Sequence, residues 1–286
     1  MTYVTFMGQN MQEISKNIRQ IVKTIEDQLG ISKPLFDTNY TFSPQNQISI
    51  QDLEFLKSNP SALSKYIDHT ALKATTTTED IQNLCQEAQT YEFCSICIPS
   101  GFVQEAHRYF KNSSSSYIPK TCVVVGFPLG NSESVIKCKE IEHCIELGVD
   151  EIDFVMNVGW LLQKRYDLIL NEFQMIRNTS QDKIIKVILE TCYLNFDQIV
   201  VACIIARLAK LDFVKTSTGF GTGGAQIDDV ALMHRLFGDV GEVKASGGIR
   251  NVDDALRFLQ SGATRLGCSK GVSIVTGRPS IDSTSY

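Results

Sequence analysis

Residues 212–246 read DFVKTSTGFGTGGAQIDDVALMHRLFGDVGEVKAS, and this stretch decides the fold class. Its two ends, Asp212–Thr216 and Glu242–Ser246, are short apolar runs of the kind that form buried strands. Between them, Ile227–Phe237 has the apolar spacing of an amphipathic helix. A strand, a helix and a second strand form the unit from which parallel sheets are built.

The same alternation extends outward in both directions. Six further strands are predicted at Lys65–Asp68, Ser95–Ile98, Thr121–Gly126, Glu151–Met156, Ile184–Glu190 and Thr264–Gly267. Helical segments are predicted at Glu79–Tyr91, Ser132–Leu147, Asn195–Ala209 and Val252–Ser261. Eight strands that alternate with helices predict an α/β fold, a (β/α)₈ TIM barrel, because such barrels typically need about 250 residues. An open doubly wound sheet is the alternative.

The first sixty residues follow a different pattern. Apolar residues recur at helical spacing from Met11 to Leu29, and Gly30 provides a stop. Ser32–Gln47 has no periodicity and is interpreted as a linker. We therefore divide the chain into an N-terminal helical extension and linker, residues 1–60, and a barrel, residues 61–286. The helix could dock on the barrel or on a second subunit.

Composition excludes several classes of protein. The 286 residues are 43% hydrophobic and 21% charged, with a net charge of −5, which disfavours nucleic acid as a partner. No apolar stretch approaches the ~20 residues of a membrane helix. The nine cysteines and the polar start predict a reduced, cytoplasmic protein.

Cys94 and Cys97 have the spacing of a metal or redox motif. Residues three apart on a strand point to opposite faces, so no metal site is expected at this pair.

Charged residues interrupt four of the predicted strands. These are Asp153, Lys186, Lys215 and Lys244, and a charge inside a covered strand is costly unless it has a function. Lys215 and Lys244 lie near the carboxyl ends of the sixth and seventh strands, where barrel active sites form. Burial and a neighbouring cation both lower the pKa of a lysine, and a neutral lysine forms a Schiff base with carbonyl compounds. A passive buried network with Asp153 is the alternative.

A glycine-rich segment follows the sixth strand. Gly219-Phe-Gly-Thr-Gly-Gly224 matches a dinucleotide-binding fingerprint, but that fingerprint belongs after the first strand of its fold, with an acidic residue near position 244. Lys244 stands there instead. We expect the loop at Gly219 to bring its backbone close to a phosphate.

Four motifs resemble the deoxyribose-phosphate aldolases, a family of class I aldolases. They are Tyr66-Ile-Asp-His-Thr-Ala-Leu-Lys73, Val125-Gly-Phe-Pro-Leu-Gly130, Lys215-Thr-Ser-Thr-Gly-Phe220 and Lys244-Ala-Ser-Gly-Gly-Ile-Arg250. The resemblance runs from about Tyr66 to Gly277. It implies a lyase that reversibly cleaves 2-deoxy-D-ribose 5-phosphate into D-glyceraldehyde 3-phosphate and acetaldehyde, in deoxyribonucleotide catabolism.

The resemblance also implies a role for each site residue. Lys215 would form the Schiff base, Lys244 would favour its neutral amine, and Asp153 would carry protons through a water, supported by Asp68 and Lys186. Gly247, Gly248, Gly267 and Ser269 would hold the phosphate. Tyr286, the last residue, would assist proton transfer at the enamine carbon. Neither a cofactor nor a metal is implied.

Two departures from the family pattern and two rival functions stay open. The first sixty residues have no counterpart in shorter bacterial members, and Lys270 stands where a small or hydroxylic residue is usual. We expect a homo-oligomer, a dimer or a tetramer. The rival functions are a Schiff-base aldolase for another phosphosugar and an inactive barrel that serves as a binding scaffold.

Overall fold

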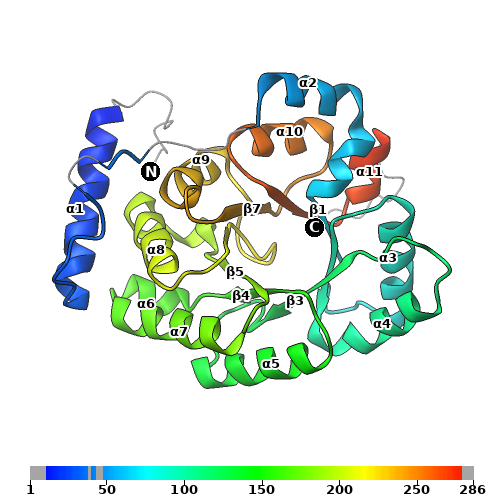
Figure 1. The fold of residues 1–286 in the computed structure, drawn as a ribbon, viewed down its shortest axis with the longest axis horizontal. Helices are drawn as coiled ribbons and strands as arrows, with labels where there is room; N and C mark the ends of the chain where they lie inside the picture. The colour runs from blue at the N-terminus through cyan, green and yellow to red at the C-terminus, as the bar shows by residue number, and fades with distance from the viewer. Residues whose placement is uncertain (1–10, 38–39, 43–47, 279–286) are drawn as a thin grey trace.

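The fold is a closed barrel of eight parallel strands surrounded by helices (Figure 1). It is described by a computed structural model over residues 11–37, 40–42 and 48–278. The strands pair in chain order, and β1 closes the ring by pairing with β8. They are β1 (Ile67–Thr70), β2 (Ser95–Pro99), β3 (Lys120–Val125), β4 (Glu151–Val155), β5 (Ile184–Ile188), β6 (Phe213–Lys215), β7 (Glu242–Ser246) and β8 (Arg265–Cys268). The predicted TIM barrel is confirmed, and the open sheet is wrong.

Most strand boundaries differ from the sequence prediction by one residue, and the first and fifth strands differ by two. β1 begins at Ile67 because residues Pro60–Tyr66 form a 3₁₀ helix. β5 ends at Ile188, two residues before the predicted end, because Glu190 adopts a left-handed backbone conformation that no strand can continue.

Strand register places the charged residues on one side of the sheet. Lys215 pairs with Lys244, and Asp153 pairs with Lys186. Register partners on parallel strands point to the same face, and these side chains are buried inside the barrel. The apolar residues that alternate with them, such as Val214 and Val243, point outward and pack under the helices.

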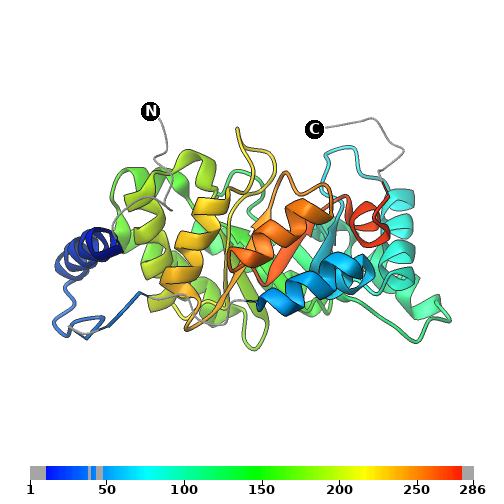
Figure 2. The same cartoon turned by 90° about the horizontal axis from the view of Figure 1, so that it is seen from above.

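The helices form an outer ring around the barrel (Figures 1 and 2). Side chains of Thr77, Asn195 and Asn251 cap three of them by accepting from backbone N–H groups in the first turn. The ring contains α3 (Thr78–Thr90), α4 (Val103–Asn112), α5 (Ser134–Glu146), α6 (Val158–Leu162), α7 (Tyr166–Thr179), α8 (Phe196–Leu208), α9 (Ile227–Phe237), α10 (Val252–Gln260) and α11 (Gly271–Thr276).

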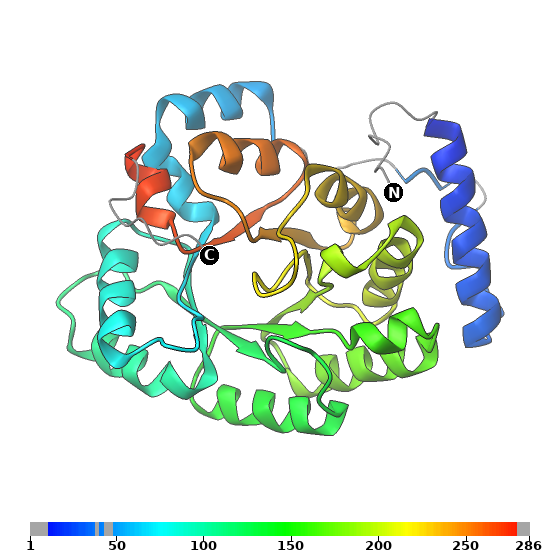
Figure 3. The same ribbon diagram turned by 180° about the vertical axis from the view of Figure 1, so that it is seen from behind.

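The N-terminal helix α1 (Met11–Leu29) has the predicted bounds and lies outside this ring (Figures 1 and 3). It contacts α8 and α7 of its own chain. Its apolar stripe, which includes Ile14, Ile18 and Ile25, is buried there. The sequence left open whether this helix docks on the barrel or on a second subunit. In the structure it docks on the barrel of its own chain.

The segment after α1 is fixed to the barrel by polar contacts. Tyr40 donates its hydroxyl to Asp239 at 2.6 Å, and Arg207 forms an ion pair with the same carboxylate. Arg235 donates to the backbone oxygen of Phe42 at 2.9 Å. The described part of the predicted linker is therefore held against the barrel.

A second helix in the extension, α2 (Ile50–Ser58), was not predicted from the sequence. It is short and packs against α10 and the 3₁₀ helix. Leu56 is its buried residue, so it lacks the apolar periodicity that identified α1. No helix in the described part of the chain is long and apolar enough to cross a membrane.

Candidate active site

Three lysines converge on the carboxylate of Asp153 in the centre of the barrel. Its Oδ2 lies 2.8 Å from Nζ of Lys215 and 2.7 Å from Nζ of Lys244, while its Oδ1 lies 2.8 Å from Nζ of Lys186. Cys122 donates its thiol to the same Oδ1 at 3.1 Å. Strands β4, β5, β6 and β7 supply these lysines and this aspartate, so the cluster requires the closed barrel.

A second layer of charges lies next to the first. Arg265 contacts Asp68 Oδ1 at 2.7 Å and Glu151 Oε2 at 2.8 Å. Lys186 contacts Glu151 at 2.6 Å, and Lys244 forms an ion pair with Asp68. Asp68 therefore bridges two basic groups, and Glu151 bridges three because Lys120 also contacts it at 3.1 Å. Charges this deeply buried are compensated in this way.

The pKa values follow from these contacts. Burial disfavours the ionised carboxyl of Asp153, but Lys186, Lys215 and Lys244 outweigh burial and hold its pKa well below the usual range. Burial lowers the pKa of Lys244, but Asp153 and Asp68 outweigh burial and keep its pKa well above the usual range. The expectation that burial and a neighbouring cation lower the pKa is therefore wrong for Lys244. It stays a cation because two carboxylates contact it.

Lys215 differs from the other two lysines in place and in partners. It is the last residue of β6, at the carboxyl end of the barrel, and its side chain keeps 3% of its surface exposed, whereas Lys186 and Lys244 keep none. Among the ion pairs of the described residues, Lys215 has one carboxylate partner, and Lys186 and Lys244 have two each. Lys215 is therefore the lysine of this cluster that is least enclosed by carboxylates and nearest the mouth of the barrel.

The predicted phosphate residues lie on loops beside this end of the barrel. Gly219 follows β6, and Gly247 and Gly248 follow β7. All three have a positive φ, between 85° and 87°, which only glycine adopts readily. Ser269 is exposed after β8, whereas Gly267 lies within β8, where a Cβ would be 3.0 Å from the Lys244 side chain. The structure thus brings together the loops of Gly247 and Gly219, since Ala225 N donates to Gly247 O at 3.1 Å.

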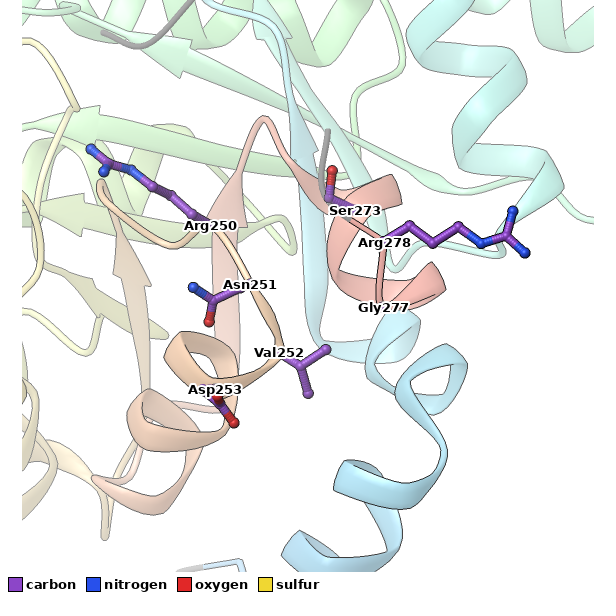
Figure 4. A pocket seen from close by; sticks show the side chains of 7 residues that line it. All are labelled: Arg250, Asn251, Val252, Asp253, Ser273, Gly277 and Arg278. Carbon is purple, nitrogen blue, oxygen red and sulfur yellow. The ribbon is translucent and has the colours of Figure 1, made fainter. Parts of the chain in front are cut away.

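A cleft of about 430 Å³ lies at the edge of this region, away from the lysines (Figure 4). Arg250 and Arg278 line it, but their side chains point in opposite directions. The other lining residues are Asn251, Val252, Asp253, Ser273 and Gly277. Arg250, one of the lining residues, follows the Gly247 and Gly248 turn after β7.

Two groups of potential metal ligands lie within the same cluster. Among the described residues, ligand atoms of Cys97, Cys122 and Asp153 lie within 4.8 Å of one another, as do those of Asp68, Cys122 and Glu151. Every carboxylate in these groups already pairs with a lysine or arginine, so a cation would compete with those side chains. Cys94 lies just before β2 and is partly exposed, outside both groups.

Comparisons with known proteins show the family to which this chain belongs. Residues 62–279 match the model of the DeoC/LacD family aldolases. The chain belongs to the DeoC/LacD aldolase family. This aldolase is 46% identical to the deoxyribose-phosphate aldolase of Carboxydothermus hydrogenoformans over 219 residues, 75% of this chain and 94% of that one. It is 46% identical to the Streptococcus sanguinis deoxyribose-phosphate aldolase over 215 residues, 75% of this chain and 96% of that one.

Solved structures extend the likeness. A Coccidioides immitis protein provisionally named deoxyribose-phosphate aldolase has a TM-score of 0.75 and 32% identity, and covers 94% of this aldolase and 98% of its own chain. The deoxyribose-phosphate aldolase of Aeropyrum pernix, described as tetrameric, has a TM-score of 0.68 and 28% identity. The match covers 80% of this chain and 98% of the Aeropyrum pernix chain. Coverage of 94% means that the likeness to the first structure includes much of the N-terminal extension.

The sequence-predicted catalytic residues divide into two groups. The structure gathers Lys215, Lys244, Asp153, Asp68 and Lys186 into one network. Sequence reasoning missed Glu151 and Arg265, although both lie in predicted strands and alternate with residues already identified, Asp153 and Gly267. That alternation was the available signal. Tyr286 lies outside the described residues.

Proposed function

We propose that the chain catalyses the reversible retro-aldol cleavage of 2-deoxy-D-ribose 5-phosphate to D-glyceraldehyde 3-phosphate and acetaldehyde, through a Schiff base on Lys215. The observation that carries this proposal is the place of Lys215, at the mouth of the barrel and with one carboxylate partner among the residues that the structure describes. Membership of an aldolase family and relatives named deoxyribose-phosphate aldolase support the choice of reaction.

Lys215 attacks the aldehyde carbon, C1, of the open-chain sugar. Loss of water gives a protonated imine, which accepts the electron pair of the C2–C3 bond as that bond breaks. The hydroxyl on C3 loses its proton and becomes the aldehyde of glyceraldehyde 3-phosphate. The remaining enamine gains a proton at C2, and hydrolysis of the imine releases acetaldehyde and free Lys215.

Asp153 and Lys244 support these proton transfers. The Asp153 carboxylate contacts Lys215 Nζ at 2.8 Å, so it can accept a proton from that nitrogen and return it. Lys244 stays charged and disfavours a second ammonium beside it, which favours the amine form of Lys215. Lys186 and Asp68 hold Asp153 and Lys244 in place through their own ion pairs.

The glycine loops select the phosphate end of the substrate. Gly219, Gly247, Gly248 and Ser269 surround the mouth after β6, β7 and β8, with Gly267 at the end of β8, and backbone N–H groups in such loops bind phosphate. Lys270, next to Ser269, supplies a further cation. Tyr286 is proposed as an acid/base partner at the enamine carbon.

We also propose a homo-oligomer, a dimer or a tetramer, that works in the cytoplasm without a metal or organic cofactor. The tetramer described for the Aeropyrum pernix relative supports assembly. All nine cysteines are free, which fits a reducing compartment. Measuring the mass of the full chain in solution tests the oligomeric state.

One assay separates the proposed reaction from its alternatives. Purified protein is mixed with 2-deoxyribose 5-phosphate, and glyceraldehyde 3-phosphate is followed through a coupled triose-phosphate dehydrogenase. Turnover that survives excess EDTA supports the proposal. Turnover of another phosphosugar alone would indicate a different Schiff-base aldolase, inhibition reversed by zinc would indicate a metal-dependent enzyme, and no turnover would indicate a scaffold.

A further inference from the structure

Glu190 has an unusual backbone for a buried residue. It follows β5 with φ 56° and ψ 60°, a left-handed conformation that residues other than glycine seldom adopt. The other four described non-glycine residues with positive φ, Glu92, Lys164, Gln181 and Lys210, are exposed. Glu190 is 4% exposed. Such a conformation in a buried charged residue at the active end of a barrel marks a functional constraint.

The Glu190 carboxylate binds the loop after β6. The backbone N–H of Thr218 donates to its two oxygens at 3.2 and 3.3 Å, and the Thr218 hydroxyl donates to Oε2. The hydroxyl oxygen of Thr218 in turn accepts from the backbone N–H of Phe220 at 3.0 Å. One carboxylate therefore fixes the first half of the glycine-rich loop, three residues beyond Lys215.

Close packing holds the rest of this loop. Gly221 lies so near Glu190 that a Cβ there would be 3.2 Å from the carboxyl carbon. At the far end, Ala225 N donates to Ser246 O and Gly247 O, both at 3.1 Å. The loop is thus suspended between Glu190 after β5 and the turn after β7, and in Figure 2 it projects in yellow from one end of the barrel.

The loop carries the backbone donors that an anion would meet. Thr218 and Phe220 use their N–H groups within the loop, so an anion is met by the glycine amides beyond them. A free carboxylate here would repel a phosphate, but that of Glu190 is directed at Thr218 and buried behind the loop.

We propose that Glu190 is a positioning residue that holds residues 217–224 in the conformation that binds the phosphate of the substrate. This inference rests on the proposed function, since it assigns that loop to the phosphate end. Glu190 acts through Thr218 and does not touch the reacting atoms.

The test compares Glu190→Gln and Thr218→Val with 2-deoxyribose 5-phosphate and with unphosphorylated 2-deoxyribose. Loss of a hydrogen bond to a charged group predicts a KM for the phosphorylated substrate about tenfold higher or more, with kcat much less affected. The KM for unphosphorylated 2-deoxyribose should stay unchanged. The double variant should lose no more than either single variant, because both break one contact. Thr218→Ser, which keeps the hydroxyl, should restore a low KM.

Glu92→Gln is the matched control, because Glu92 has the same left-handed backbone, φ 54°, but is exposed after α3. Calorimetry with inorganic phosphate adds a readout that does not need turnover, and binding should weaken in Glu190→Gln. Equal losses on both sugars, or unchanged KM and phosphate binding, would overturn the positioning role. An inactive wild-type protein that still loses phosphate binding in the variant would instead overturn the proposed reaction.

Discussion

Lys215 and Lys244 are register partners on β6 and β7, and their ammonium groups share one oxygen, Oδ2 of Asp153. Because Asp68 binds Lys244 as well, the two lysines are not equivalent. Lys244 is held as a cation inside the barrel, whereas Lys215 lies at the mouth and contacts Asp153 alone among the carboxylates of the described residues. Register thus gives two similar lysines different surroundings, which is the basis for proposing Lys215 as the nucleophile and Lys244 as a fixed charge.

The Schiff base predicts where acetaldehyde attaches. Acetaldehyde with sodium borohydride should add a two-carbon unit to Lys215 and abolish activity, because reduction of the imine is irreversible. Peptide mass spectrometry locates the modification. Lys215→Met should prevent labelling, whereas Lys210→Met, at an exposed site after α8, should label like the parent. Modification of Lys186 or Lys244 instead would refute the assignment.

Removing the fixed charge should alter the pH dependence. Lys244→Met keeps apolar bulk but removes the cation, so the ammonium form of Lys215 becomes more favourable. We expect kcat at neutral pH to fall about 100-fold or more and the pH–rate profile to shift to higher pH. The buried carboxylates lose a partner, so circular dichroism must verify the fold. A profile that overlays the parent's would contradict this role.

Asp229 on α9 makes stability depend on pH. Burial raises its pKa to about 6, and the charge of Asp228 adds to the rise. A carboxyl with a raised native pKa stabilises the fold fully below its unfolded value of about 3.9, and that stability is lost as pH rises through 6. At pH 8, Asp229→Asn should therefore raise the free energy of unfolding, measured by urea denaturation, by about 1–3 kcal/mol. At pH 4 the variant and the parent should be equally stable. A stability difference between variant and parent that stays constant from pH 4 to pH 8 would contradict the raised pKa of Asp229.

The contact between α1 and α8 should contribute to folding. Ile18 is fully buried between them, so Ile18→Ala should lower the free energy of unfolding by about 2–5 kcal/mol. Lys16→Ala, on the exposed face of α1, is the control. A truncation that begins at Ser61 should aggregate, as light scattering would show, because it uncovers α8. A monodisperse, equally stable truncation would show that α1 is dispensable for folding.

The last residue gives a kinetic prediction. If Tyr286 transfers a proton at the enamine carbon, its deletion should slow exchange of solvent deuterium into acetaldehyde, measured by NMR. Imine trapping on Lys215 should stay near the parent rate, because that step precedes enamine formation. Equal slowing of both steps would indicate general damage, and unchanged turnover would exclude the role.

The structure supplies what the linear pattern left open in the extension. The helix α8 is apolar on nearly all sides, with Ile199, Val200, Val201 and Ile204 all buried. A helix that is apolar all round must be covered on two faces. The barrel covers one face and α1 the other. The composition of α8 could not show this, because a second subunit would cover that face equally well. The helix α2 gave no signal in the sequence, because one buried leucine has no period.

The sequence by itself determined the barrel, its eight strands and the lysines and aspartate of the site. Those features depend on local periodicity and on the cost of placing a charge in a covered strand, and both can be read along the chain. Only the tertiary structure decided how the partners of Lys215 and Lys244 differ, that Glu151 and Arg265 complete the network, and that Glu190 binds the glycine loop. Ion pairing depends on distances between residues up to 197 positions apart, such as Asp68 and Arg265, and barrel closure alone sets those distances.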